Sequence, residues 1–245
     1  MSRILCQAAL FTSGLLITAL SASAEERQVY SVDSPAWMRA VGKLTVPGSR
    51  YENGRYNHHH EDCSATLVSL ATRNRADTII TAWHCIEYYG DLSKPILFTL
   101  PGNSGQDLTR EVYRVFDGGS MHADWAILKM HQAISTNSVA AVMPHSGRAN
   151  PAKEVSMAGY SRDAGLGNGG EHLTYDEGCK ITLQANNSSD TDCIAHKGAS
   201  GGAVIQLSEQ GAAHYIGVIS RGDGDGVSIF VPTEYFRGPL RRALE

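Results

Sequence analysis

The stretch HKGASGGAV, residues 196–204, surrounds one serine with three glycines. Glycine reaches backbone angles that other residues avoid, and serine bonds to its own backbone, so these residues are typical of a tight turn. The same turn would also expose the hydroxyl of Ser200 as a nucleophile. The choice between these interpretations depends on whether the rest of the chain supplies a base for that hydroxyl.

Two further stretches carry the groups that such a nucleophile needs. TIITAWHC, residues 78–85, places His84 at the end of an apolar run, and HADWAILKM, residues 122–130, places Asp124 at the start of another. A serine hydroxyl is a weak nucleophile near neutral pH unless an imidazole takes its proton, and a carboxylate must orient that imidazole. The neighbouring glycines leave backbone N–H groups free to bind an oxyanion. Ser200, His84 and Asp124 are therefore candidates for an acyl-transfer triad.

Short apolar runs rich in β-branched residues recur along the chain, separated by Gly, Pro, Asn and Asp. This pattern predicts an all-β sandwich or barrel. Residues 135–150 are small and polar and predict a connector between two halves, an N-terminal unit at 25–140 and a C-terminal unit at 141–245. Only residues 233–244 have a helical pattern, which Gly238-Pro239 is expected to interrupt. The predicted strands are 41–46, 65–70, 78–82, 96–100, 112–116, 125–130, 155–159, 181–184, 203–207, 215–220 and 227–231.

Residues 1–24 have the pattern of a signal peptide. Arg3 precedes the largely apolar run 4–20, and Ala22-Ser23-Ala24 has the small-x-small pattern that signal peptidase accepts. The alternative, a membrane anchor, needs a longer run than these 17 residues with their polar interruptions. We expect a mature chain that begins at Glu25 and is exported to the periplasm or the extracellular space, without membrane contact after cleavage.

The composition is that of an ordinary globular protein, with 42% hydrophobic and 19% charged residues and a formal net charge of −4. No basic patch indicates nucleic acid as a partner. The expected partners are a protein or peptide substrate and a protein inhibitor. We expect a monomer that needs no cofactor.

Four cysteines remain after the leader: Cys63, Cys85, Cys179 and Cys193. An even number in an exported chain favours disulfides, and three pairings are open. Pairing of sequence neighbours would close loops with separations of 22 and 14 residues, and each bond would stabilise the fold by about 3 kcal/mol. A zinc site is the rival interpretation, but the chain has no Cys-x-x-Cys spacing.

Several histidines lie outside the candidate triad. His58-His59-His60 precedes two acidic residues and suggests a metal site, but consecutive strand residues point to alternate sides and cannot all face one ion. We expect a solvated loop there and no metal. His122 and His196 lie close to the triad motifs in sequence and are expected to be exposed.

Six motifs occur in one order along the chain: CSATLVS at 63–69, TAWHC at 81–85, DWAIL at 124–128, VSMAGYS at 155–161, GASGG at 198–202 and IGVISRG at 216–222. Together they resemble the chymotrypsin-like (trypsin-fold) serine peptidases, over nearly all of the mature chain. The position of Cys193, seven residues before the serine, is similar to that in the bacterial branch of staphylococcal glutamyl-endopeptidase-like (V8-like) enzymes.

The resemblance implies two six-stranded antiparallel β-barrels with the active site between them. Ser200 would be the nucleophile of a serine endopeptidase, His84 its general base and then general acid, and Asp124 the orienting carboxylate. The backbone N–H groups of Gly198 and Ser200 would form the oxyanion hole. Ser220 would support Asp124, and the segment from Ser220 to Gly222 would pair with the substrate.

The resemblance also pairs Cys63 with Cys85 and Cys179 with Cys193. It places the specificity pocket at six residues: Ile194 and Ala195 at the base, Ile219 and Ser220 at the wall, Gly222 and Gly226 at the back. No aspartate occupies the base, and Ile219 replaces the histidine of glutamyl-specific relatives. We expect an apolar or small residue before the scissile bond, with attraction of a basic residue by Asp223 and Asp225 as the alternative.

One residue departs from the family signature. The aspartate that usually precedes the serine is Ala199 here. In trypsin-type zymogens that aspartate pairs with a newly freed N-terminal amine. We therefore expect a serine loop that becomes ordered on folding, without an inserted N-terminus. A propeptide within residues 25–40 that blocks the cleft is the alternative.

Two other functions were weighed. GASGG also fits the Gly-x-Ser-x-Gly elbow of α/β-hydrolases, but those chains place the acid and the histidine after the serine, and here only His214 follows it. A catalytically silent family member that binds a partner is the stronger alternative. The intact set of His84, Asp124 and Ser200 argues against it.

Overall fold

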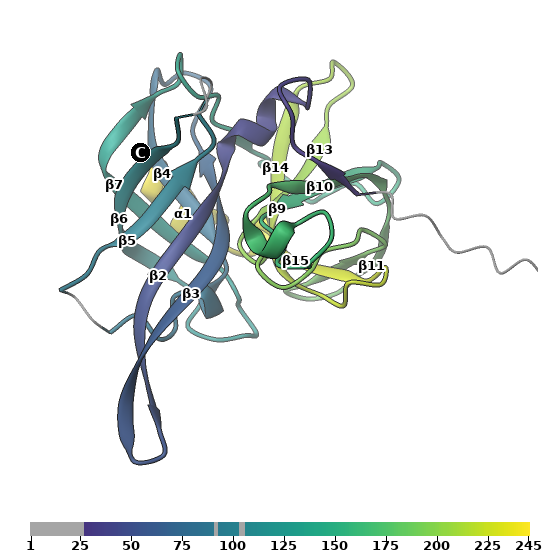
Figure 1. Ribbon diagram of the computed structural model, residues 1–245. Coiled ribbons are helices and arrows are strands. Elements are labelled where there is room, and N and C mark those ends of the chain that lie inside the picture. The colour runs from purple at the N-terminus through teal and green to yellow at the C-terminus, as the bar shows by residue number, and fades with distance from the viewer. Residues whose placement is uncertain (1–26, 91–92, 103–105) are drawn as a thin grey trace, which may run out of the picture.

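A computed structural model describes residues 27–90, 93–102 and 106–245 (Figure 1). The predicted signal peptide at 1–24 lies outside the described residues. Strands form two units that lie side by side, and each of the eleven predicted runs overlaps a strand. The all-β prediction is confirmed. The strands without a predicted counterpart are β1 (Gln28–Val29), β8 (Met143–Pro144), β10 (Thr174–Cys179) and β12 (Ser189–Thr191).

The first unit is a closed barrel with the strand order β2-β3-β4-β7-β6-β5. Alternate side chains of each strand fill its interior, among them Leu44, Leu67 and Phe98, all completely buried. Gly42 allows the ring of Phe98 to lie against the backbone, since a Cβ there would be 2.5 Å from that ring. Its strands are β2 (Val41–Glu52), β3 (Arg55–Val68), β4 (Arg75–Thr81), β5 (Ile96–Leu100), β6 (Leu108–Asp117) and β7 (Ala126–Ser135).

The second unit is a curled sheet with the order β1-β10-β9-β13-β14-β15-β12-β11 and with β8 beside β14. It is not closed by a ladder of hydrogen bonds. β10 and β11 lie near opposite ends of this strand order but are separated in the chain only by Lys180. One bent segment therefore joins the two ends of the curled sheet. The further strands are β9 (Val155–Gly159), β11 (Ile181–Gln184), β13 (Ala203–Leu207), β14 (Ala213–Gly222) and β15 (Ser228–Pro232).

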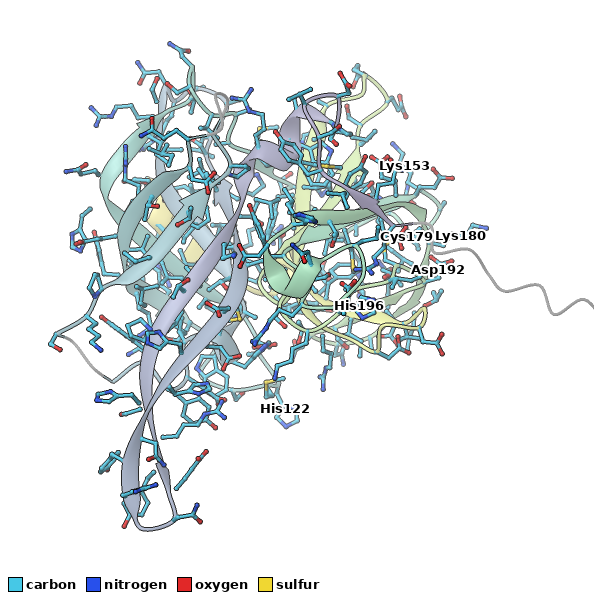
Figure 2. All side chains as sticks on the ribbon, viewed as in Figure 1. His122, Lys153, Cys179, Lys180, Asp192 and His196 are labelled. Atoms are coloured by element: carbon cyan, nitrogen blue, oxygen red, sulfur yellow. A yellow bond between two sulfur atoms is a disulfide. The ribbon has the colours of Figure 1, made fainter. Side chains whose placement is uncertain are left out.

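The bend at Lys180 is held by two kinds of bond. The backbone N–H of Lys180 donates to Oδ1 of Asp192 (2.6 Å), and a disulfide joins Cys179 to Cys193. Figure 2 shows Cys179, Lys180 and Asp192 together at the outer edge of this unit. The second disulfide joins Cys63 to Cys85 in the first unit, so both bonds link sequence neighbours, as the resemblance implied.

Each end of the described chain packs against the unit that the other half of the chain forms. β1 pairs with β10 of the second sheet, whereas helix α1 (Arg237–Leu244) packs against the first barrel. The rings of Trp125 and Phe236 stack there with centroids 5.1 Å apart. Figure 1 places the C-terminus beside the first barrel. The domain boundary after residue 140 stays a prediction.

The predicted interruption of the helix at Gly238-Pro239 is wrong. Both residues lie in the first turn of α1, where proline is tolerated because its missing N–H would have no partner in the helix. The helical segment is instead divided at Phe236, which separates the short 3-10 turn η4 (Thr233–Tyr235) from α1.

The β2–β3 hairpin extends well beyond the barrel (Figure 1). Asn53 and Gly54 form its two-residue turn with positive φ angles of 53° and 80°, the geometry that matches the twist of a hairpin. The expected loop at His58-His59-His60 is therefore wrong, because these residues belong to β3. Their alternate orientation is as expected: His58 and His60 are exposed, and His59 bonds Glu61 (2.7 Å).

Replacing both Cys179 and Cys193 by alanine should lower the free energy of unfolding by about 3 kcal/mol, because the unfolded chain regains the entropy of a 14-residue loop. Urea denaturation of the oxidised wild type and the double variant measures this difference. A loss below about 1 kcal/mol would contradict the closing role assigned to this bond.

Candidate active site

His84 lies in a short 3-10 turn, η2 (Trp83–Cys85), directly after β4. The disulfide of Cys85 with Cys63 ties this turn to β3. The imidazole is therefore fixed at the edge of the first barrel. Its neighbour in space is Asp124, which precedes β7.

Asp124 is completely buried and accepts hydrogen bonds from both units. Its Oδ1 accepts the backbone N–H of His84 (2.9 Å), and its Oδ2 lies 2.9 Å from Nδ1 of His84 and accepts the Ser220 hydroxyl (2.5 Å). A buried carboxylate needs such donors to offset its lost hydration. Because Asp124 can only accept when ionised, this network assigns the ring proton to Nδ1 and leaves Nε2 of His84 as the free acceptor.

Ser200 lies between these groups and the second sheet. Its hydroxyl donates to the carbonyl of Ser220 (3.2 Å), and no hydrogen bond joins it to His84, although both residues lie in the described part of the chain. Ser220 therefore contacts both candidate groups, Asp124 through its hydroxyl and Ser200 through its carbonyl.

The serine loop, residues 196–202, is clamped through its carbonyl groups. The carbonyl of Gly198 accepts the Ser64 hydroxyl (2.9 Å), and that of Ser200 accepts the Ser64 N–H (2.8 Å). Among the described residues, neither the N–H of Gly198 nor that of Ser200 donates to a protein acceptor. Gly198 has a φ of +96°, and a Cβ there would lie 2.5 Å from the Tyr160 carbonyl, so only glycine fits.

A hollow of about 210 Å³, the active-site hollow, lies over Ser200. Of the six residues predicted for the specificity pocket, Ile219, Ser220 and Gly222 line it. Ile194, Ala195 and Gly226 do not. The sequence reasoning missed part of the lining, since it depends on which loops meet. The complete lining is His84, Met121, His196, Lys197, Ser200, Ile219, Ser220, Arg221 and Gly222.

Ala195 lies directly behind Gly222. A Cβ on Gly222 would be 2.2 Å from the Ala195 carbonyl oxygen, so the base and the back of the expected pocket lie close together. The N–H of Ile194 donates instead to the buried carboxylate of Asp176 (2.7 Å). His122 is exposed as expected, whereas His196 is half-buried at the hollow (Figure 2).

The described residues contain two groups of three potential metal ligands. Within each group the ligand atoms lie within 4.8 Å of one another, and each group includes two cysteines. All four sulfurs are bonded in disulfides, so neither group offers a thiolate.

The trypsin family model matches residues 42–237. Among curated proteins, a sequence search finds no match. The family match confirms the resemblance drawn from the six motifs.

Solved protease structures share the fold. Protease Anisep from Arthrobacter nicotinovorans has a TM-score of 0.59 and 18% identity, over 84% of this chain and 93% of that one. A Glu endopeptidase in complex with MPD has a TM-score of 0.62 and 17% identity, over 90% and 97%. The thermostable serine protease AL20 from an extremophilic microorganism has values of 0.61 and 17%, over 86% and 99%.

Replacing Ser220 by alanine should lower the free energy of unfolding by about 1.5–3 kcal/mol, because it removes a donor from a buried charge. Ser228→Ala is the matched control, since the Ser228 hydroxyl is equally buried but donates to a neutral carbonyl, that of Cys193. Urea denaturation compares the two variants. If Ser220→Ala loses no more free energy of unfolding than Ser228→Ala, the interpretation that the Ser220 hydroxyl stabilises a charged carboxylate is contradicted.

Proposed function

Since the chain belongs to the trypsin family and is a serine endopeptidase, we propose that it hydrolyses peptide bonds through an acyl-enzyme formed on Ser200. The observation that carries this proposal is the buried network of Asp124, which joins His84 of one unit to Ser220 of the other beside the serine. His84 takes the proton of Ser200 at Nε2 during attack and returns it to the leaving amine. Asp124 holds the imidazole and stabilises the imidazolium that forms.

The two unbonded N–H groups of the serine loop are the proposed oxyanion hole. As the hydroxyl oxygen attacks, the substrate carbonyl becomes an oxyanion, and preorganised donors stabilise that charge without reorganisation. The clamped carbonyls of Gly198 and Ser200 support this role because they fix the peptide planes of the loop. A water molecule then hydrolyses the ester, with His84 as its base.

The end of β14 is the proposed binding edge for an extended substrate. Beyond Ile219, whose N–H donates to Gly202 (3.1 Å), β14 pairs only with β15, so in the described chain no other strand pairs with its edge from Ser220 to Gly222. The Ser220 carbonyl on this edge accepts the Ser200 hydroxyl. A peptide can add to such an edge as a further strand.

We propose preference for a small or short apolar residue before the scissile bond. The close approach of Ala195 to Gly222 supports it, because a Cβ on Gly222 would lie 2.2 Å from the Ala195 carbonyl oxygen and the two backbones narrow the expected pocket there. No carboxylate lines the active-site hollow within the described chain, which argues against a basic residue. Asp223 is engaged in its own turn, where its Oδ1 accepts two backbone N–H groups, those of Asp225 and Val227.

Export is proposed as well, with cleavage after residue 24 and action in the periplasm or outside the cell. The two disulfides support it, because they persist in oxidising compartments. No helix of the described residues is long and apolar enough to span a membrane.

A fluorophosphonate probe should label the wild type stoichiometrically at Ser200. Ser200→Ala should not be labelled, and Asp124→Asn should be labelled about 10³–10⁴-fold more slowly, because the imidazole is held in the wrong tautomer. Mass spectrometry of the tryptic digest locates the adduct. Absence of labelling in folded wild type would overturn the proposal and favour a silent, partner-binding family member.

Cleavage of a mixed peptide library should yield sites preceded mainly by Gly, Ala, Ser or Val. Peptides with Arg or Lys at that position should be cleaved at least about 10-fold more slowly, since a cationic side chain would be desolvated without a carboxylate partner in the hollow. Sequencing of the products by mass spectrometry reads this position directly. Dominant cleavage after Arg, Lys or Glu would refute the proposed preference.

A further inference from the structure

The serine loop rests on a second segment, residues 160–163, which follows β9. The N–H of Arg162 donates to the Lys197 carbonyl (2.6 Å). The N–H of Tyr160 donates to the Ser64 hydroxyl (2.8 Å), which itself donates to Gly198. The stem of Arg162 also packs against Gly198, where a Cβ would be 2.6 Å away. A shift of residues 160–163 would therefore move the peptide planes of the serine loop.

An ion pair fixes the far end of this supporting segment. Nη1 of Arg27 donates to Oδ1 of Asp163 (3.0 Å), and the two side chains are only 1% and 13% exposed. Oδ2 of Asp163 accepts the N–H of Gly167 (3.2 Å). Burial would raise the pKa of Asp163, but the hydrogen bonds from Arg27 and Gly167, together with the charges of Arg27 and His196, hold it at about 2. The carboxylate is thus ionised at neutral pH and attracted from both sides.

Arg27 is itself held in place by the strand that follows it. β1 pairs with β10 in the register Gln28 to Tyr175, and the N–H of Tyr30 donates to the Leu173 carbonyl (2.8 Å). The hydroxyl of Tyr175 also donates to the Gln28 side chain (2.9 Å). The N-terminal segment therefore places the buried guanidinium of Arg27 beside Asp163, at the end of the segment 160–163.

Residue 199, directly before the serine, offers no charged group that could anchor the serine loop. The resemblance implies an ion pair at the residue before the serine, but the Ala199 methyl is buried against Gly159, with 3.0 Å to a Cβ placed there. No charge can anchor the serine loop at that position. The Arg27–Asp163 pair lies one segment away and reaches the loop through residues 160–163.

We propose that Arg27 is a positioning residue for catalysis, which holds the serine loop in its oxyanion-binding form through Asp163 and the segment 160–163. The proposal rests on the acyl-enzyme function proposed above. Arg27 touches neither substrate nor the reacting atoms. Its loss should therefore reduce the rate of the chemical step and leave substrate binding nearly unchanged.

The test compares Arg27→Gln, Arg27→Met and Arg27→Lys with wild type on one peptide substrate and with the fluorophosphonate probe. For Arg27→Gln and Arg27→Met, kcat and the labelling rate should fall together by about 10-fold or more, with KM within about twofold, since the oxyanion donors shift. Arg27→Lys should recover most of both rates because it restores the charge.

Lys129→Met is the control. It breaks an ion pair of similar length with Asp77 (2.8 Å), whose side chains are more exposed (19% and 41%) and lie on the first barrel, and it should leave kcat unchanged. Asp163→Asn combined with Arg27→Gln should lower kcat by less than the sum of the two single effects on the activation free energy, since the two residues share one ion pair.

The outcomes separate this inference from the proposed function. A wild type that neither cleaves nor labels would refute the proposed function. An active wild type with a folded Arg27→Gln variant of equal kcat and equal labelling rate would overturn the positioning role. If Arg27→Met does not fold, Arg27→Gln, which keeps a hydrogen-bond donor, and Arg27→Lys still decide the question.

Discussion

Ser64 is the constraint on which the active site depends, because at a completely buried position it takes part in four hydrogen bonds, three of which join the first unit to the second. Its N–H and hydroxyl donate to the serine loop, its hydroxyl accepts the N–H of Tyr160, and its carbonyl accepts the Thr81 hydroxyl (2.8 Å). Thr81 ends the strand that leads to His84. Ser64 therefore links the strand that leads to His84 with the loop that carries Ser200.

The local parts of this architecture could be predicted from the sequence. Strand periodicity depends on neighbouring residues, so all eleven predicted runs overlap strands, and the triad motifs lie in short stretches. The position of Gly238-Pro239 was misjudged because helix-breaking residues act differently in a first turn. The exposed strand of the hairpin was missed because its long polar stretch lacks an apolar face.

The remaining features depend on contacts between distant segments. Ser64 lies in the motif CSATLVS, but no neighbouring residue in the sequence indicates that its hydroxyl bridges Gly198 and Tyr160. The active-site hollow was predicted only in part, since its lining depends on how closely Gly222 approaches Ala195. Arg27 gave no signal at all, because a single arginine near the start of a chain is normally solvated.

The residues at positions 199 and 159 depend on each other, because Ala199 packs against the backbone of Gly159. A carboxylate buried at position 199 without a cation would be strongly destabilised by lost hydration. Alanine fills the space instead, against a glycine that leaves room for it. A negative charge is buried instead at Asp163, where Arg27 pairs with it. In the proposed positioning role, order in the serine loop depends on this ion pair, which the N-terminal segment supplies.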